Sequence, residues 1–176
     1  MEFYLIYKGP LKANGDKNHK YEIRKFFHHQ LKKLWESHPV LKAFQGKPGR
    51  PDITEKVGNC IFIPLVSDKL KMRAKLNIFM LTQDGIKGVV KGGDIDNRLK
   101  TLFDALRCPK TENELPEEGI NDIDRYNPMF CLLQDDSLIE DIRVHKEMLL
   151  LEEIETFLLI HVEIRITQRI WATADF

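Results

Sequence analysis

The sequence feature that most constrains the fold is a strict alternation of apolar and polar residues in two stretches far apart in the chain. Residues 158–166 carry an aliphatic side chain at every second position, with histidine, glutamate and arginine at three positions between them. Residues 72–80 repeat the pattern with arginine, lysine and asparagine. Because successive side chains of a strand point to opposite faces, both stretches are predicted to be strands of a sheet with one face on the core.

Two other stretches have the spacing of amphipathic helices. The first runs from about His19 to Pro39, and Val40–Phe44 is a candidate short continuation. The second, Asp94–Arg107, has apolar residues at i, i+4, i+7, i+8 and i+11, which form one stripe on a helix. Asp94 is placed to cap its start. The apolar positions are Ile23, Phe26, Phe27, Leu31, Leu34 and Trp35 in the first stretch and Ile95, Leu99, Leu102, Phe103 and Leu106 in the second.

Further short apolar runs complete the pattern of elements. Strands are predicted at Phe3–Tyr7 and Cys60–Val66, at Met129–Leu133 and between Ile142 and Leu150. Residues 45–59, rich in Gly and Pro, are predicted to be a loop, and an acidic loop insertion is predicted at about 107–134. The order of elements predicts one α+β domain over residues 1–176, with two main helices packed on a mixed β-sheet.

The composition excludes several classes of protein. With 43% hydrophobic and 31% charged residues, the 176-residue chain has enough apolar material for a core, which excludes wholesale disorder. No apolar run is long enough to span a bilayer, and the first residues lack the pattern of a signal peptide. Three cysteines without a C-x-x-C pair favour free, buried thiols. We therefore expect a cytoplasmic protein that does not interact with membranes.

The charge is strongly segregated, although it sums to zero. Residues 1–93 hold 18 Lys and Arg against 8 Asp and Glu, whereas residues 94–176 hold 9 against 19. This segregation predicts a positive surface beside an acidic cluster, which an enzyme acting on a phosphate backbone would use to hold the polyanion and a metal. Pairing of the two signs across the fold is the simpler alternative, and it stays open.

Four aspartates and one lysine form the candidate chemical constellation. Asp94 and Asp96 fall in the first turn of the second predicted helix, and Lys100 follows Asp96 by one turn. Asp135 and Asp136 close a short apolar run after the long connection. If that run lies beside the start of the helix, the carboxylates converge and need a cation, because like charges repel. Mg²⁺ takes such oxygen ligands, and the ammonium of Lys100 would then neutralise charge developing on a phosphate.

Each of these residues also has a simpler explanation. Asp94 alone is typical of a helix N-cap, and Asp135-Asp136 alone is typical of a solvated turn. Lys100 alone is typical of an i,i+4 ion pair with Asp96 on a helix surface. Spacing by itself therefore leaves both the metal site and an ordinary surface open.

The joint pattern resembles the RusA family of Holliday-junction resolvases. The segments that carry the resemblance are GDIDNRLKTLFDAL (93–106) and LLQDDSLIEDIRVHK (132–146). The family pattern is D-x-D-N-x-x-K, a helix ending in D-A-L, a connection, and then D-D-x-x-[IV] leading into a strand. The matching residues are Asp94, Asp96, Asn97, Lys100, Asp104, Ala105, Leu106, Asp135, Asp136 and Ile139.

The resemblance implies a RusA-like fold and a homodimeric, Mg²⁺-dependent endonuclease, with Mn²⁺ as a substitute, that resolves four-way DNA junctions in recombination and repair. Position by position, it implies that Asp94, Asp96, Asp136 and Lys100 are catalytic. It also implies that the metal is held by the three aspartates together with Asp135.

The basic first half of the chain and the two lysines before Asp94 supply the expected contacts with the DNA backbone. These contacts are Lys8, Lys12, Lys17, Lys20, Arg24, Lys25, Lys87 and Lys91. Two alternatives remain for the function. One is a non-cleaving nucleic-acid-binding or interaction module with the same fold, and the other is a nuclease for other branched DNA.

Overall fold

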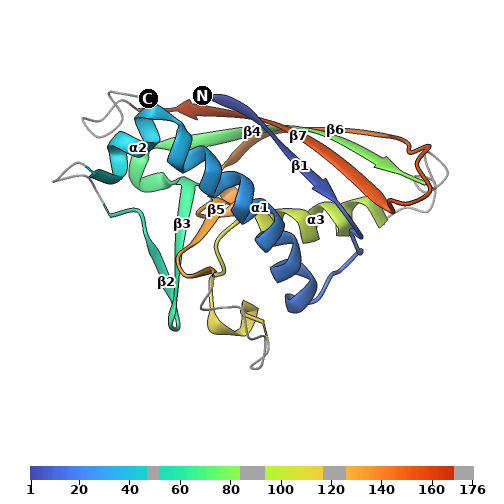
Figure 1. Cartoon of the computed structure of the whole chain (residues 1–176), viewed down its shortest axis with the longest axis horizontal. Helices are drawn as coiled ribbons and strands as arrows, with labels where there is room; N and C mark the ends of the chain where they lie inside the picture. The colour runs from blue at the N-terminus through green and yellow to red at the C-terminus, as the bar shows by residue number, and fades with distance from the viewer. Residues whose placement is uncertain (47–51, 84–93, 117–125, 169–176) are drawn as a thin grey trace.

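A four-stranded sheet carries the helices and a smaller sheet on one of its faces (Figure 1). The computed structural model describes residues 1–46, 52–83, 94–116 and 126–168. Its elements are β1 (Glu2–Lys8), α1 (Lys17–Ser37), α2 (Pro39–Gly46), β2 (Glu55–Val57), β3 (Cys60–Val66), β4 (Met72–Thr82), α3 (Asp94–Leu106), β5 (Met129–Leu133), β6 (Ile139–Met148) and β7 (Thr156–Ile166). The predicted α+β class is confirmed.

The large sheet has the strand order β1-β7-β4-β6, with the two alternating stretches of the sequence at its centre. β7 runs antiparallel to both β1 and β4, whereas β4 and β6 are parallel. Along β4 every second residue is buried, as the alternation predicts. β6 is an edge strand, and its predicted core positions Ile142 and Met148 remain 43% and 54% exposed.

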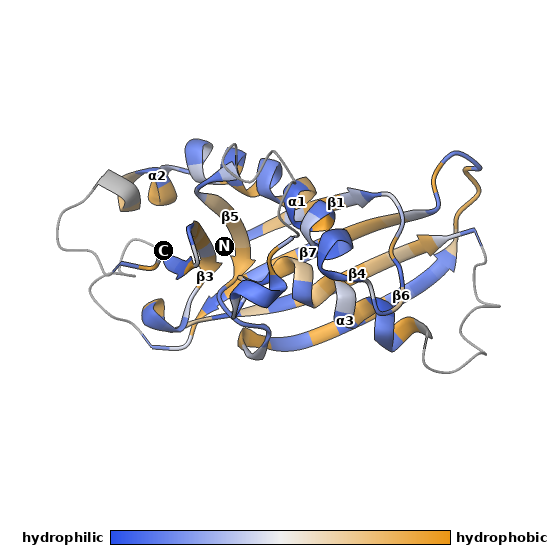
Figure 2. Cartoon of the chain, turned by 90° about the horizontal axis from the view of Figure 1, so that it is seen from below, coloured by the Kyte–Doolittle hydropathy of each residue, from blue (hydrophilic) through white to orange (hydrophobic). Residues whose placement is uncertain are grey.

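A second sheet, with the order β2-β3-β5, replaces the single sheet that the sequence predicts. β3 and β5 are hydrophobic along most of their length (Figure 2), and all five residues of β5 are buried. β2 lies within the stretch predicted to be a loop. Because β5 belongs to the core, the acidic insertion is shorter than residues 107–134. Its described residues outside α3 and β5 are 107–116, 126–128 and 134.

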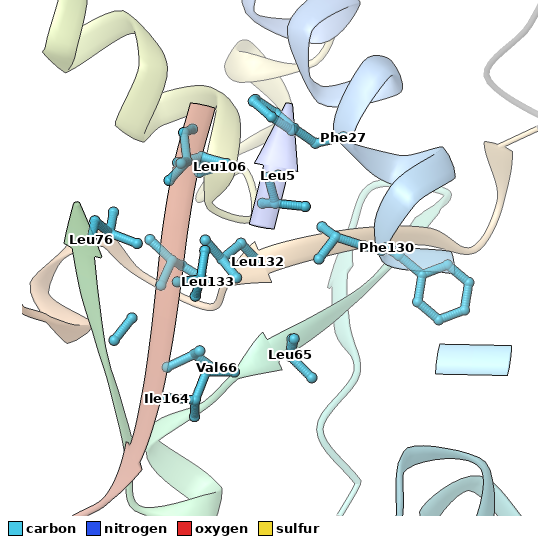
Figure 3. Packing of buried hydrophobic residues seen from close by; sticks show 14 of the residues in the cluster. Leu5, Phe27, Leu65, Val66, Leu76, Leu106, Phe130, Leu132, Leu133 and Ile164 are labelled. Atoms are coloured by element: carbon cyan, nitrogen blue, oxygen red, sulfur yellow. The ribbon is translucent and has the colours of Figure 1, made fainter. Parts of the chain in front are cut away.

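The core forms between the large sheet, the small sheet and the helices. Figure 3 shows members of this one cluster from α1 (Phe27), α3 (Leu106) and β5 (Leu133), together with Leu5 and Ile164 of the large sheet. Trp35 at the other end of α1 is 1% exposed. The apolar stripe predicted for α3 is confirmed for Leu102 and Leu106, which are fully buried, while Leu99 and Phe103 are partly buried against the same core.

Local sequence explains where the helices begin and end. Asp16 caps α1, because its carboxylate accepts the backbone N–H of His19 at 2.8 Å. Pro39 begins α2 directly after the end of α1, which matches the predicted boundary and the short continuation. No helix in the described part of the chain is both long and apolar enough to cross a membrane.

Candidate functional site

The first half of the family-like pattern lies on one exposed side of α3. The helix begins at Asp94, and the side chains of Asp96 and Lys100 are exposed one turn apart. Nothing is described for the side chain of Asp94, and Lys87 and Lys91 lie outside the described residues. The apolar positions of α3 point instead toward the sheet, which fixes the orientation of the exposed side.

A groove of about 420 Å³ separates α3 from the N-terminal end of α1. Lys17 and Lys20 of α1 line it from one side, and Lys100 of α3 lines it from the other. The loop before α1 is tied to α3, because the N–H of Gly15 donates to Thr101 Oγ1 at 2.9 Å. A Cβ at Gly15 would lie 2.8 Å from Thr101 Cγ2, so this close approach requires glycine. The loop before α1 is therefore held against α3, and the groove between the two helices is lined by three lysine ammonium groups.

The floor of this groove is a charged network around Asp104. Its carboxylate accepts a hydrogen bond from Lys20 at 2.8 Å and another from Arg107 at 2.9 Å. Arg107 also forms an ion pair with Glu114 at 2.8 Å. Burial opposes the ionisation of Asp104, but the hydrogen bonds and charges of Lys20 and Arg107 lower its pKa. Burial likewise opposes the charge of Arg107, but Glu114 and Asp104 raise its pKa. Both groups therefore stay ionised.

The D-A-L segment has a structural role in this network. Ala105 and Leu106 are 1% exposed, and Asp104 joins α3 to α1 through Lys20. Arg24 of α1 adds a second connection, because it donates to the backbone oxygens of Asp104 at 2.7 Å and Arg107 at 3.3 Å. It thus satisfies carbonyl groups that the end of a helix leaves unpaired.

The structure gives Arg24, which is expected to contact DNA, an internal role. The side chain is 2% exposed and is held by the end of α3, at the bottom of the groove between the two helices. The periodicity did place this position on the buried side of the helix, since Arg24 follows Ile23 and precedes Phe27 by one turn. An arginine between core positions of a helix, as here between Ile23 and Phe27, indicates a side chain that hydrogen-bonds inside the protein.

The other expected DNA contacts are spread over several surfaces. Lys8 is exposed at the end of β1, where its ammonium lies 5.8 Å from the centre of the Phe157 ring. Lys12 is exposed in the loop before α1. Lys25 pairs with Glu22 at 2.7 Å and lies over two tyrosine rings. Of the described lysines predicted to bind DNA, those that share the groove with Lys100 are Lys17 and Lys20.

The second acidic pair lies just after the end of β5, beside a lysine. Asp135 caps a single 3₁₀ turn, because its carboxylate accepts the N–H of Ser137 at 2.9 Å. Lys110 Nζ lies 2.6 Å from Asp135 and 3.7 Å from Asp136. The hydrogen bond from Lys110, with help from Ser137, holds the pKa of Asp135 well below its usual range. Sequence reasoning missed Lys110, although it is an isolated base in an acidic stretch.

The two acidic pairs are not brought together. The backbone of Arg107, just after α3, bridges to Leu133 at the end of β5, so Asp135 and Asp136 lie near the C-terminal end of the helix. Asp96 lies eleven residues before Arg107, about 16 Å along the helix. The parallel pairing of β4 with β6 has the same consequence, because α3 follows the end of β4 whereas Asp136 precedes the start of β6.

This separation decides which residues fit a magnesium ion. Mg²⁺ holds its ligands at about 2.0–2.1 Å, so Asp96 and Asp136 cannot share one ion in this arrangement. Within the described ranges no three histidine, cysteine or acidic side chains are grouped as metal ligands. Of the expected four carboxylates, Asp96 and Asp136 therefore do not fit one ion. The exposed carboxylate of Asp96 agrees with a site of fewer protein ligands, since Mg²⁺ commonly takes one or two carboxylates together with phosphates.

Comparisons with protein-family models, curated proteins and solved structures gave no match to this chain.

Proposed function

We propose that the protein is a Mg²⁺-dependent endonuclease that cuts branched DNA, with the four-way junction as its substrate. The observation that carries this proposal is the exposed pair of Asp96 and Lys100 on α3, beside a groove that Lys17 and Lys20 line from α1. Metal-dependent phosphodiester hydrolysis uses carboxylates to bind the metal and positive groups to bind the phosphate. The D-x-D-N-x-x-K pattern of the RusA family falls on the same residues.

The groove explains how the chain would hold its substrate. A DNA phosphate between α1 and α3 would meet the ammonium groups of Lys17, Lys20 and Lys100, while Asp104 keeps Lys20 in place at 2.8 Å. Lys100 would stabilise charge that develops on the phosphate as it is attacked. Mg²⁺ at Asp96, with Asp94 as the neighbouring acid, would supply an activated water for that attack.

Asp135 and Asp136 take a different role in this proposal. Lys110 pairs with both carboxylates, at 2.6 Å from Asp135 and 3.7 Å from Asp136, and Asp135 shapes the turn that leads into β6. This role departs from what the family resemblance implies for Asp136. The difference is testable, because Asp136→Asn then leaves the metal site unchanged.

Junction cleavage tests the proposal directly. A labelled immobile four-way junction and the matching linear duplex are incubated with the protein and Mg²⁺ or EDTA. We expect paired nicks on the junction that require the metal, and at least a hundredfold slower cutting by Asp96→Asn and Lys100→Met, in the range of a lost electrostatic contact at a reacting phosphate. Glu36→Gln is the matched control, since Glu36 is also an exposed helical acid one turn from a lysine.

Unchanged cutting by Asp96→Asn would overturn the assignment of the site. If Asp136→Asn lost as much cutting activity as Asp96→Asn while its thermal stability was preserved, the second acidic pair would act in catalysis. That result would overturn a metal site that lacks Asp135 and Asp136. Preference for a flap or three-way substrate over the four-way junction would retain the nuclease and replace its substrate.

The second candidate function is a non-cleaving nucleic-acid-binding module. The separation of the two acidic pairs and the ion pairs of Lys110 favour it, because they leave fewer carboxylates for a metal. A binding module would shift the junction in a gel without cutting it, and Mg²⁺ would not raise its melting temperature. A metal site in the native state would raise that temperature by mass action.

A further inference from the structure

The acidic insertion contributes part of the groove between α1 and α3. Asn113 and Glu114 line the groove together with residues of both helices. Both belong to a single 3₁₀ turn, Glu112–Glu114, that follows α3 closely. This turn therefore lies beside the lysines that the proposed function assigns to the DNA backbone.

The turn is anchored on the side of the small sheet. The N–H of Glu114 donates to the carbonyl oxygen of Thr111 at 3.1 Å, and Leu115 packs, partly buried, against the cluster that the small sheet forms. Gly58, just after β2, lies so close to the turn that an added Cβ would be 3.2 Å from Glu112 Oε1. These contacts hold the backbone of Glu114 in place, so the side chain can leave the groove only by rotating.

Three acidic side chains line the groove, and one of them comes from outside the two helices and their caps. Asp16 caps α1, and Asp104 of α3 holds Lys20. Glu114 reaches Arg107 Nη1 at 2.8 Å. The side chain of Glu114 is 34% exposed, whereas that of Arg107 is 8% exposed. Glu114 thus brings an accessible carboxylate onto a guanidinium at the floor of the groove.

Arg107 does not need Glu114 to keep its position. Its Nε and Nη2 donate to Asp104 Oδ1 at 3.2 Å and 2.9 Å, and its Nη1 donates to the carbonyl oxygen of Cys108 at 2.9 Å. Arginine binds carboxylate and phosphate with the same N–H donors. A phosphate can therefore take the place of the Glu114 carboxylate while the guanidinium stays where it is.

We propose that Glu114 occupies the place of a DNA phosphate in the groove and must leave Arg107 before DNA binds there. The inference rests on the proposed function, because the groove is the surface assigned to the DNA backbone. Lys17, Lys20 and Lys100 attract the polyanion, and the phosphate that displaces Glu114 gains Arg107 as a further contact. Because this exchange breaks one ion pair for the one that it forms, Glu114 lowers the affinity of the groove for DNA.

Binding of a labelled four-way junction in EDTA, followed by fluorescence anisotropy, tests the inference without requiring cutting. Glu114→Gln keeps the size of the side chain and removes its charge, so it should bind the junction about tenfold more tightly, as expected for one charged contact. Glu112→Gln is the matched control. Glu112 belongs to the same turn and is exposed, but it is not among the described residues that line the groove. Its affinity should stay within about threefold of the wild type, because solvent screens a charge outside the groove.

The salt dependence of binding separates a direct contact from a general effect of charge. Each phosphate contact adds about 0.9 to the slope of log K against log salt concentration on duplex DNA. Glu114→Gln should steepen this slope by about that amount, because Arg107 is then free to release a counterion from the DNA. Glu112→Gln should leave the slope unchanged.

The outcomes for the two proposals are distinguishable. If Glu114→Gln bound the junction no more tightly than Glu112→Gln, or if its slope were that of the wild type, the inference would be overturned. Tighter binding by Glu114→Gln, with no cutting by any variant in Mg²⁺, would support the inference and overturn the nuclease. If neither the wild type nor Glu114→Gln bound the junction, both would be overturned.

Discussion

At the scale of single residues, the buried charged and polar groups act mainly on the fold. His28 shows this most clearly, because its Nδ1 accepts the backbone N–H of Phe130 at 3.0 Å and the side chain is 4% exposed. Burial, together with the neighbouring charges of His29 and Lys32, lowers the pKa of His28 to about 4. The neutral ring thus joins α1 to β5, and protonation would destroy that connection.

The stability of the protein should therefore fall as the pH falls from about 6.5 to about 4. In this window the unfolded state binds a proton at His28 that the folded state does not, so acid favours unfolding. The largest loss from this group is about 3 kcal/mol. His28→Asn keeps an acceptor for the N–H of Phe130 without the titration, and chemical denaturation of this variant should show a weaker pH dependence. Identical pH profiles would contradict this role of His28.

At the scale of elements, the contact between α1 and α3 depends on the network around Asp104. Asp104→Asn removes the charge that Lys20 and Arg107 share, and it should lower the free energy of unfolding by about 3 kcal/mol, as loss of one partner of a buried pair does. Urea denaturation measures this loss. The control is Asp68→Asn, since Asp68 pairs with two bases but is exposed, and it should cost less than about 1 kcal/mol.

The elements also show what could be predicted from the sequence. The alternation in 72–80 and 158–166 and the stripe in α3 are local patterns, and each led to an element with nearly the observed bounds. The short strand β2 carries no such pattern, because three residues are too few for a period to appear. β5 was predicted as a strand, but its run of apolar residues does not tell which sheet it joins.

At the scale of the whole molecule, topology separates residues that the sequence pattern brought together. Asp96 and Lys100 could be assigned to one exposed side of a helix from their spacing alone. The distance from Asp96 to Asp136 could not be predicted from spacing. It depends on the parallel pairing of β4 with β6 and on the path of the chain between α3 and β5. Nothing in a single motif encodes those two pairings.

We propose that the functional metal binds at the start of α3. Titration of isotopically labelled protein with Mn²⁺, followed by the loss of backbone amide NMR signals near the paramagnetic ion, tests this claim without requiring activity. We predict that signals of residues 95–99 weaken first and that Asp96→Asn abolishes the effect. If the signals around Asp135 and Asp136 weakened first, or if no signals weakened at either place, the claim would be contradicted.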